Sequence, residues 1–85
     1  MAGAPLTEDA LRTLVREHAL RILELEPQEL ADATTFEDAG GDSLQRLELV
    51  SVLQDELGVQ FSVDDEVRIT SVKAAVEVAQ QALAE

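Results

Sequence analysis

Hydrophobic residues in the first third of the chain recur at helical spacing. The pattern predicts a helix from about Glu8 to about Leu23. Thr7 can cap its start, because the side-chain hydroxyl can accept a hydrogen bond from a backbone N–H in the first turn. Pro27 limits it, because the residue before a proline avoids helical geometry. The face expected to be apolar carries Leu11, Leu14, Val15, His18, Ile22 and Leu25.

Residues 25–41 break this periodicity and are predicted to form a long connection. They include Pro27, two threonines and the pair Gly40-Gly41. Loops of this length are unusual in small domains and are often functional. Three hydrophobic residues are expected to anchor the loop in the core: Leu25, Leu30 and Phe36.

Three more helices follow. The second is predicted from Asp42 or Ser43 to Leu57, with Gly58 as its stop. Ser62 and Asp65 resemble a capping box and predict a short third helix over Val63–Arg68. Thr70 or Ser71 can cap a last helix, whose expected core face carries Val72, Ala75, Val76, Ala79 and Leu83. We therefore predict an all-α four-helix bundle with a long first loop and a short third helix, as one domain over residues 1–85 with an ordered core at about 7–83.

The predicted second helix has hydrophobic residues on two faces. At roughly 100° per residue, the core stripe consists of Leu49, Val50, Leu53 and Leu57. The opposite side carries Leu44, Leu47, Glu48, Ser51 and Asp55. Either the long loop covers these leucines, or they form a docking patch in which apolar contact supplies affinity and acids supply steering. Arg46 projects toward the core side, from which its long side chain can reach outward.

Composition and charge narrow the classes of partner. Eighteen acidic and six basic residues give a net charge of -12. This charge opposes binding to nucleic acid or anionic lipid and favours basic protein surfaces or cations, although acidity can also serve solubility alone. The chain has no Cys, no apolar run near the ~18 residues of a membrane span and no signal-peptide pattern at its start. We therefore expect a cytoplasmic protein that binds neither membranes nor nucleic acid.

The segment from Gly40 to Leu44 is the strongest candidate for a chemical site. Asp42 can cap the second helix and leave the Ser43 hydroxyl free, where a phosphate ester would meet unpaired N–H groups and the positive end of the helix dipole. Ser43 at this position can equally be the cap itself. A catalytic role requires a base, and the only His, His18, is expected to be structural on the first helix. The chain is therefore not expected to be an enzyme, and any chemistry at Ser43 would be done by another protein.

Several segments together resemble the acyl carrier protein family, over about Thr7 to Leu83. They are Asp42-Ser43-Leu44, Glu48-Leu49-Val50, Asp55-Glu56-Leu57-Gly58-Val59, Ile69-Thr70-Ser71-Val72 and Ala74-Ala75-Val76. The resemblance implies the helical bundle of that family, in a discrete carrier. It also implies a 4'-phosphopantetheine arm, transferred from coenzyme A to Ser43, between Asp42 and Leu44, by a phosphopantetheinyl transferase. The thiol of the arm would carry acyl groups as thioesters in fatty acid or polyketide-type biosynthesis.

The resemblance further implies a docking face for enzymes with basic patches, namely acyltransferases, ketosynthases or adenylating enzymes. By position this face consists of Leu44, Leu47, Glu48, Ser51 and Asp55. Ser51 departs from the family, in which a larger apolar residue such as Met is common. A growing chain in this family can enter between the helices, which would place Leu49, Leu53, Phe61 and Ile69 at a cleft. A monomer is expected, because a shuttle must visit several partners.

Two alternatives stay open. Gly40-Gly41 before the serine is typical of peptidyl carrier proteins of nonribosomal peptide synthesis, whereas the acidity and Glu48 favour acyl cargo. The cluster Asp64-Asp65-Glu66 would suit an acidic interaction or cation-binding module without a prosthetic group. The loop from Asp38 to Ser43 does not fit an EF-hand, because its third position is Gly and its sixth, where Gly is expected, is Ser.

Overall fold

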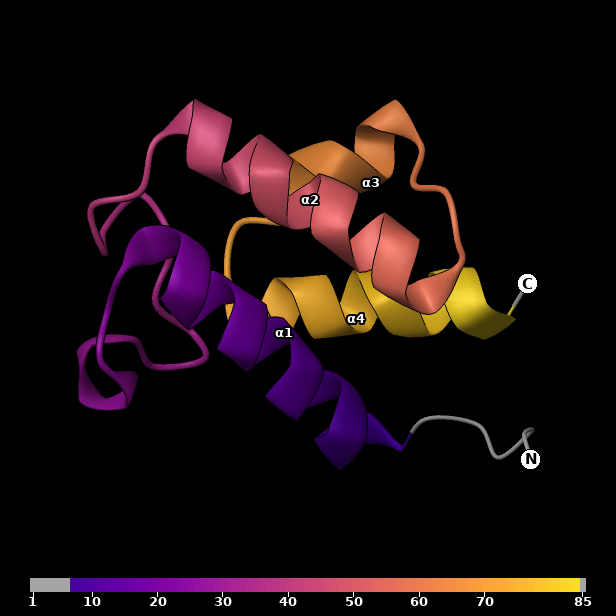
Figure 1. Ribbon diagram of the computed structural model, residues 1–85. Coiled ribbons are helices and arrows are strands. Elements are labelled where there is room, and N and C mark those ends of the chain that lie inside the picture. The colour runs from indigo at the N-terminus through magenta and orange to yellow at the C-terminus, as the bar shows by residue number, and fades with distance from the viewer. Residues whose placement is uncertain (1–6, 85) are drawn as a thin grey trace.

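A computed structural model describes residues 7–84 of the chain, and within them it is all-helical (Figure 1). The helices are α1 (Glu8–Leu23), a 3₁₀-helix η1 (Pro27–Glu29), α2 (Ser43–Leu57), α3 (Val63–Arg68) and α4 (Val72–Ala84). The four predicted helices and the long first loop are confirmed, whereas the sequence pattern missed η1. Residues 1–6 and 85 of the predicted domain lie outside the described part. The expectation about a signal peptide concerns the start of the chain and lies outside it as well.

The helix ends follow the expected capping chemistry. The Ala10 N–H donates to the Thr7 hydroxyl over 3.0 Å at the start of α1. Ser62 and Asp65 form the reciprocal capping box, with bonds of 3.1 and 3.2 Å. Of the two candidate caps of α4 it is Ser71 whose hydroxyl accepts, from the Ala74 N–H over 3.1 Å. These local contacts confirm the predicted starts.

The end of α1 has a different cause from the one expected. Glu24 takes a left-handed conformation, with φ at 58°. Its N–H and that of Leu25 donate to the carbonyls of Arg21 and Leu20, over 3.3 and 3.0 Å, and so close the helix. Pro27 instead opens η1, a position that needs no N–H donor.

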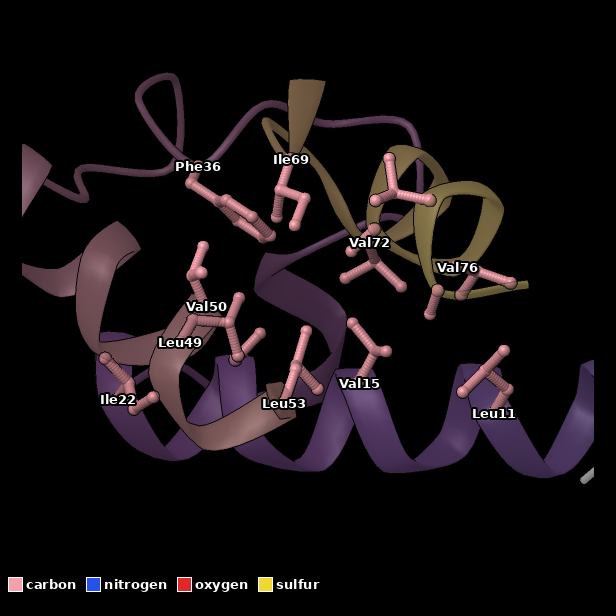
Figure 2. Packing of buried hydrophobic residues seen from close by; sticks show 14 of the residues in the cluster. Leu11, Val15, Ile22, Phe36, Leu49, Val50, Leu53, Ile69, Val72 and Val76 are labelled. Atoms are coloured by element: carbon pink, nitrogen blue, oxygen red, sulfur yellow. The ribbon is translucent and has the colours of Figure 1, made fainter. Parts of the chain in front are cut away.

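One hydrophobic core joins α1, α2 and α4 (Figure 2). The expected stripe of α2 is buried except at its end, where Leu57 is only half-buried. Leu14 and His18 are also half-buried, so the buried face of α1 is narrower than predicted. Leu83 was wrongly assigned to the core face of α4, because it lies in the last turn, beyond the packed part of the helix, and is 41% exposed. The buried hydrophobic residues are Leu11, Val15, Ala19, Ile22, Leu30, Phe36, Leu49, Val50, Leu53, Phe61, Ile69, Val72, Ala75, Val76, Val78 and Ala79.

The long loop between α1 and α2 is tied down at several points. Leu30 and Phe36 are buried as predicted, while Leu25 is only half-buried. The Arg16 guanidinium donates to the Leu30 carbonyl over 2.7 Å and to the Pro27 carbonyl over 3.0 Å. Farther along, the Phe36 N–H donates to the Thr70 carbonyl over 2.8 Å. The loop therefore delivers Gly40 and Gly41 to the start of α2 along a defined path.

No helix within residues 7–84 combines the length and the apolar character that crossing a membrane requires.

Candidate functional site

The two glycines before α2 shape the turn in different ways. Gly40 has φ at 96°, in the left-handed region that residues with a Cβ rarely adopt. Gly41 is closely packed: a Cβ there would lie 2.5 Å from Leu23 Cδ2 and 3.0 Å from the Phe36 carbonyl oxygen, so both neighbours would have to shift. The Gly41 N–H also donates to that carbonyl over 2.7 Å. The backbone therefore turns at Gly40 and comes close to Phe36 at Gly41.

Asp42, not Ser43, caps the second helix. The Asp42 carboxylate accepts the Gln45 N–H over 2.8 Å, and the Gln45 amide oxygen accepts the Asp42 N–H over 3.1 Å. Ser43 is the first residue of α2 and is exposed. Within residues 7–84 its hydroxyl has no hydrogen-bond partner. The interpretation of Ser43 as a helix cap is therefore wrong, and its hydroxyl is available for chemistry.

The start of α2 also presents backbone donors. The Arg46 N–H is the first to bond within the helix, to the Asp42 carbonyl over 3.0 Å. The Ser43 and Leu44 N–H groups precede it and have no partner in the described chain. Together with the helix dipole, they suit a phosphate ester on the Ser43 oxygen.

A groove of about 600 Å³ opens beside Ser43. Its walls come from three separate parts of the chain: the long loop, the first turn of α2 and the connection between α3 and α4. Thr35, Glu37 and Thr70 were not predicted as site residues, because no local signal in the sequence connects them with Ser43. The lining residues are Thr35, Phe36, Glu37, Gly41, Asp42, Ser43, Arg46 and Thr70.

The outward face of α2 is uncovered. Leu44 is 77% exposed and Leu47 is 45% exposed, so the long loop does not bury them. The other three residues predicted on this face are exposed as well: Glu48, Ser51 and Asp55. The five therefore form a continuous surface of leucines and acids that begins next to Ser43.

The residues expected at a cleft are part of the closed core. Leu49, Leu53, Phe61 and Ile69 are all buried. The void beside Leu49 is too narrow for a water molecule. Space near Ser43 is instead provided by the groove, in which Phe36 is the one buried core residue among the described lining residues.

Within residues 7–84, no imidazole lies at Ser43. His18 is half-buried on α1, where its Nδ1 lies 3.0 Å from Arg21 Nη2 and its Nε2 lies 3.8 Å from a Glu56 carboxylate oxygen. It does not line the groove. Because the Ser43 hydroxyl bonds to no imidazole or carboxylate of residues 7–84, the described chain lacks the nucleophile–base pair of a serine hydrolase. Nor do three or more His, Asp or Glu side chains in this part of the chain gather into a metal-binding group.

Comparison with known proteins agrees with this geometry. The family profile of the phosphopantetheine attachment site matches residues 13–79. An acyl carrier protein of Zymomonas mobilis is 35% identical over 71 residues, which cover 82% of this chain and 86% of the relative. An acyl carrier protein of Nitratidesulfovibrio vulgaris is 39% identical over 46 residues, or 54% of this chain and 60% of the relative.

The family match spans most of the chain and includes the whole of α2. The matching family is defined by a covalently attached phosphopantetheine. The matched segment contains the free serine hydroxyl, the unpaired backbone donors and the adjoining groove. Such proteins work with a phosphopantetheinyl transferase and with biosynthetic enzymes, which perform the chemistry. The chain therefore belongs to the acyl carrier protein family, as a carrier and not an enzyme, with 4'-phosphopantetheine as its covalent prosthetic group.

Proposed function

We propose that Ser43 is the attachment site of 4'-phosphopantetheine and that the chain carries acyl intermediates for fatty acid or polyketide-type biosynthesis. The observation that carries this proposal is the exposed Ser43 hydroxyl, which has no partner within residues 7–84 and opens onto the groove. When bound, the prosthetic group supplies a thiol that holds the acyl group as a thioester.

The residues around Ser43 have different roles in holding the phosphopantetheine arm. Asp42 satisfies the helix start through its bond to Gln45, which leaves Ser43 free to react. The N–H groups of Ser43 and Leu44 are placed to donate to the phosphate that replaces the hydroxyl proton. Glycine at position 41 keeps the loop close to Phe36, so that the groove forms beside the attachment point.

We further propose that partner enzymes dock on the exposed face of α2. Leu44 and Leu47 supply apolar contact, while Glu48 and Asp55 supply charge, with the small Ser51 between them. A net charge of -12 steers this face toward basic surfaces, as on a transferase, acyltransferase or ketosynthase. A monomer suits such serial docking. A cytoplasmic location belongs to the proposal, because the carrier must meet coenzyme A and its partners in one compartment.

The deciding experiment is the intact mass of the folded protein after incubation with coenzyme A and a broad-range phosphopantetheinyl transferase. Wild type is expected to gain the mass of one phosphopantetheinyl group, and Ser43→Ala none. Ser62→Ala is the matched control, because Ser62 is also an exposed serine and lies outside the docking face, and it should load like wild type. Loading of Ser43→Ala, or no gain in wild type while a known carrier loads normally, would refute the proposal.

Aminoacyl cargo remains the second candidate, on the observation that Gly40-Gly41 precedes the serine. Both glycines answer geometric needs of the turn in this chain, so the pair does not by itself identify the cargo. The exposed Glu48 and the acidity support acyl cargo. Loading of the holo-protein by an adenylating enzyme, and not by an acyltransferase, would favour the peptidyl carrier instead.

A further inference from the structure

The groove beside Ser43 is lined by more acidic than basic side chains, which is unfavourable for a phosphate. Two lining residues, Glu37 and Asp42, are acids and would repel an anion on Ser43. Arg46 is the one cation among the described residues that line it. In a chain with a net charge of -12, this guanidinium is the side-chain charge of the groove that would attract a phosphate.

Arg46 is well placed on α2. It follows Ser43 by three residues, and side chains at that spacing are neighbours on a helix surface. Its Nη1 donates to the Glu66 carbonyl in α3 over 2.6 Å, which anchors the half-buried side chain to α3. A guanidinium has five N–H donors in a rigid fork, so donors remain for an anion at the same place.

The other arginines have different environments. Arg12 and Arg16 pair with Asp32, and Arg21 lies against His18. Arg68 donates to the Gln81 side chain over 3.2 Å and lies 3.6 Å from an Asp65 carboxylate oxygen. None of these four lines the groove.

We propose that Arg46 is a positioning residue for the prosthetic group: its free N–H donors bind the phosphodiester on Ser43 while Nη1 keeps its bond to Glu66. The inference rests on the proposed attachment at Ser43. Through Arg46, the phosphodiester of the arm would be linked to the contact between α2 and α3. Loading should therefore strengthen this contact in wild type, because a charge-assisted hydrogen bond is added to an existing one.

The test is a thermodynamic cycle of apo and holo forms for wild type, Arg46→Gln and Arg68→Gln. The structural contribution of Arg46 through Glu66 is lost from both the apo and holo forms, so it cancels in the difference between their melting temperatures. We expect the holo-minus-apo difference to be lower by about 2–4 °C in Arg46→Gln than in wild type. Arg68→Gln removes the same charge away from the groove and should keep the wild-type difference.

A second readout needs no variant. On loading of wild type, the NMR signal of the Arg46 Nε–H should shift, and that of the Arg68 Nε–H should stay in place. Unchanged Arg46 resonances together with equal melting differences in all three proteins would overturn the inference. Intact mass separates this result from failure of the attachment itself: without a mass gain in wild type, the proposed function is wrong, whereas with a full mass gain only the role of Arg46 is wrong.

Discussion

Two polar side chains, Ser43 and Asp32, show opposite hydrogen-bonding situations. The Ser43 hydroxyl has none within residues 7–84, which keeps it available. Asp32 is the opposite case, because its carboxylate receives hydrogen bonds from both Arg12 and Arg16. The bond from Arg12 is the main reason that the pKa of Asp32 lies below its ordinary value; desolvation opposes the shift, and Arg16 adds to it. A partnered side chain of this kind holds the loop in place, whereas the free hydroxyl is available for reaction.

Asp32→Asn is expected to lower the free energy of unfolding at neutral pH by about 1 kcal/mol, as for other partly exposed ion pairs. Because the pKa of Asp32 is lower in the folded state than the unfolded value near 3.8, its stabilisation is complete above that pH. It is lost as the pH falls through the folded-state pKa. Urea unfolding of both proteins from pH 7 down to about pH 2.5 checks this.

Asp38→Asn is the control for this pH series, because Asp38 is exposed in the same loop. It should change stability little at any pH. A penalty for Asp32→Asn that is as large at pH 2.5 as at pH 7 would show that the charge of Asp32 is not what stabilises the loop.

At the scale of elements, α2 has leucines on two faces with different surroundings. One is buried against α1 and α4 through Leu49, Val50 and Leu53. The other exposes Leu44 and Leu47 among acids. Exposed leucines contribute little to folding, so their energy is available for binding. The two faces can therefore be separated by comparing the same substitution on each.

Leu53→Ala should lower the free energy of unfolding by about 2–5 kcal/mol, because it opens a cavity in the core. Leu44→Ala should change it by less than about 0.5 kcal/mol, as is usual for exposed positions. If Leu44 contributes to docking, Leu44→Ala should still reduce kcat/KM for loading by the transferase at least about fivefold. Denaturant unfolding and initial loading rates measure the two effects, and Leu44→Ala loading at the wild-type rate would argue against the docking face.

At the scale of the whole molecule, charge and packing oppose each other. The core is built mainly from Leu, Val, Ile and Ala, with Phe36 and Phe61 as its aromatic members. Around it the chain carries a net charge of -12, whose self-repulsion weakens the folded state. The same acidity favours encounter with basic partners, so we infer that the molecule gives up some stability for association.

Added salt should therefore raise the melting temperature of the isolated protein by screening this repulsion. Most of the rise should occur below about 0.5 M NaCl, where the screening length becomes comparable to the distance between neighbouring charges. Calorimetry over a NaCl series measures it. A melting temperature that is flat at low salt, or that climbs linearly without a plateau, would contradict an electrostatic origin.

Local signals predicted the helices, because apolar periodicity and caps act over a few residues. The capping box of Ser62 and Asp65 and the cap of Asp42 formed as expected. The short helix η1 was missed although its hydrogen bonds are local. Contacts distant in sequence were missed as well, namely the bonds from Arg16 that tie the loop down. Leu83 was wrongly assigned to the core, because periodicity does not show where a helix extends beyond the elements packed against it.

The sequence by itself determined the four helices, the outward leucines of α2 and the family resemblance centred on Ser43. Only the tertiary structure decided that the loop leaves Leu44 and Leu47 exposed. It also brought Thr35, Glu37 and Thr70 to Ser43 and joined Arg46 to Glu66. The physical reason is range: turns and caps are encoded within a few neighbouring residues, whereas a groove is created by segments that meet only when the core has packed.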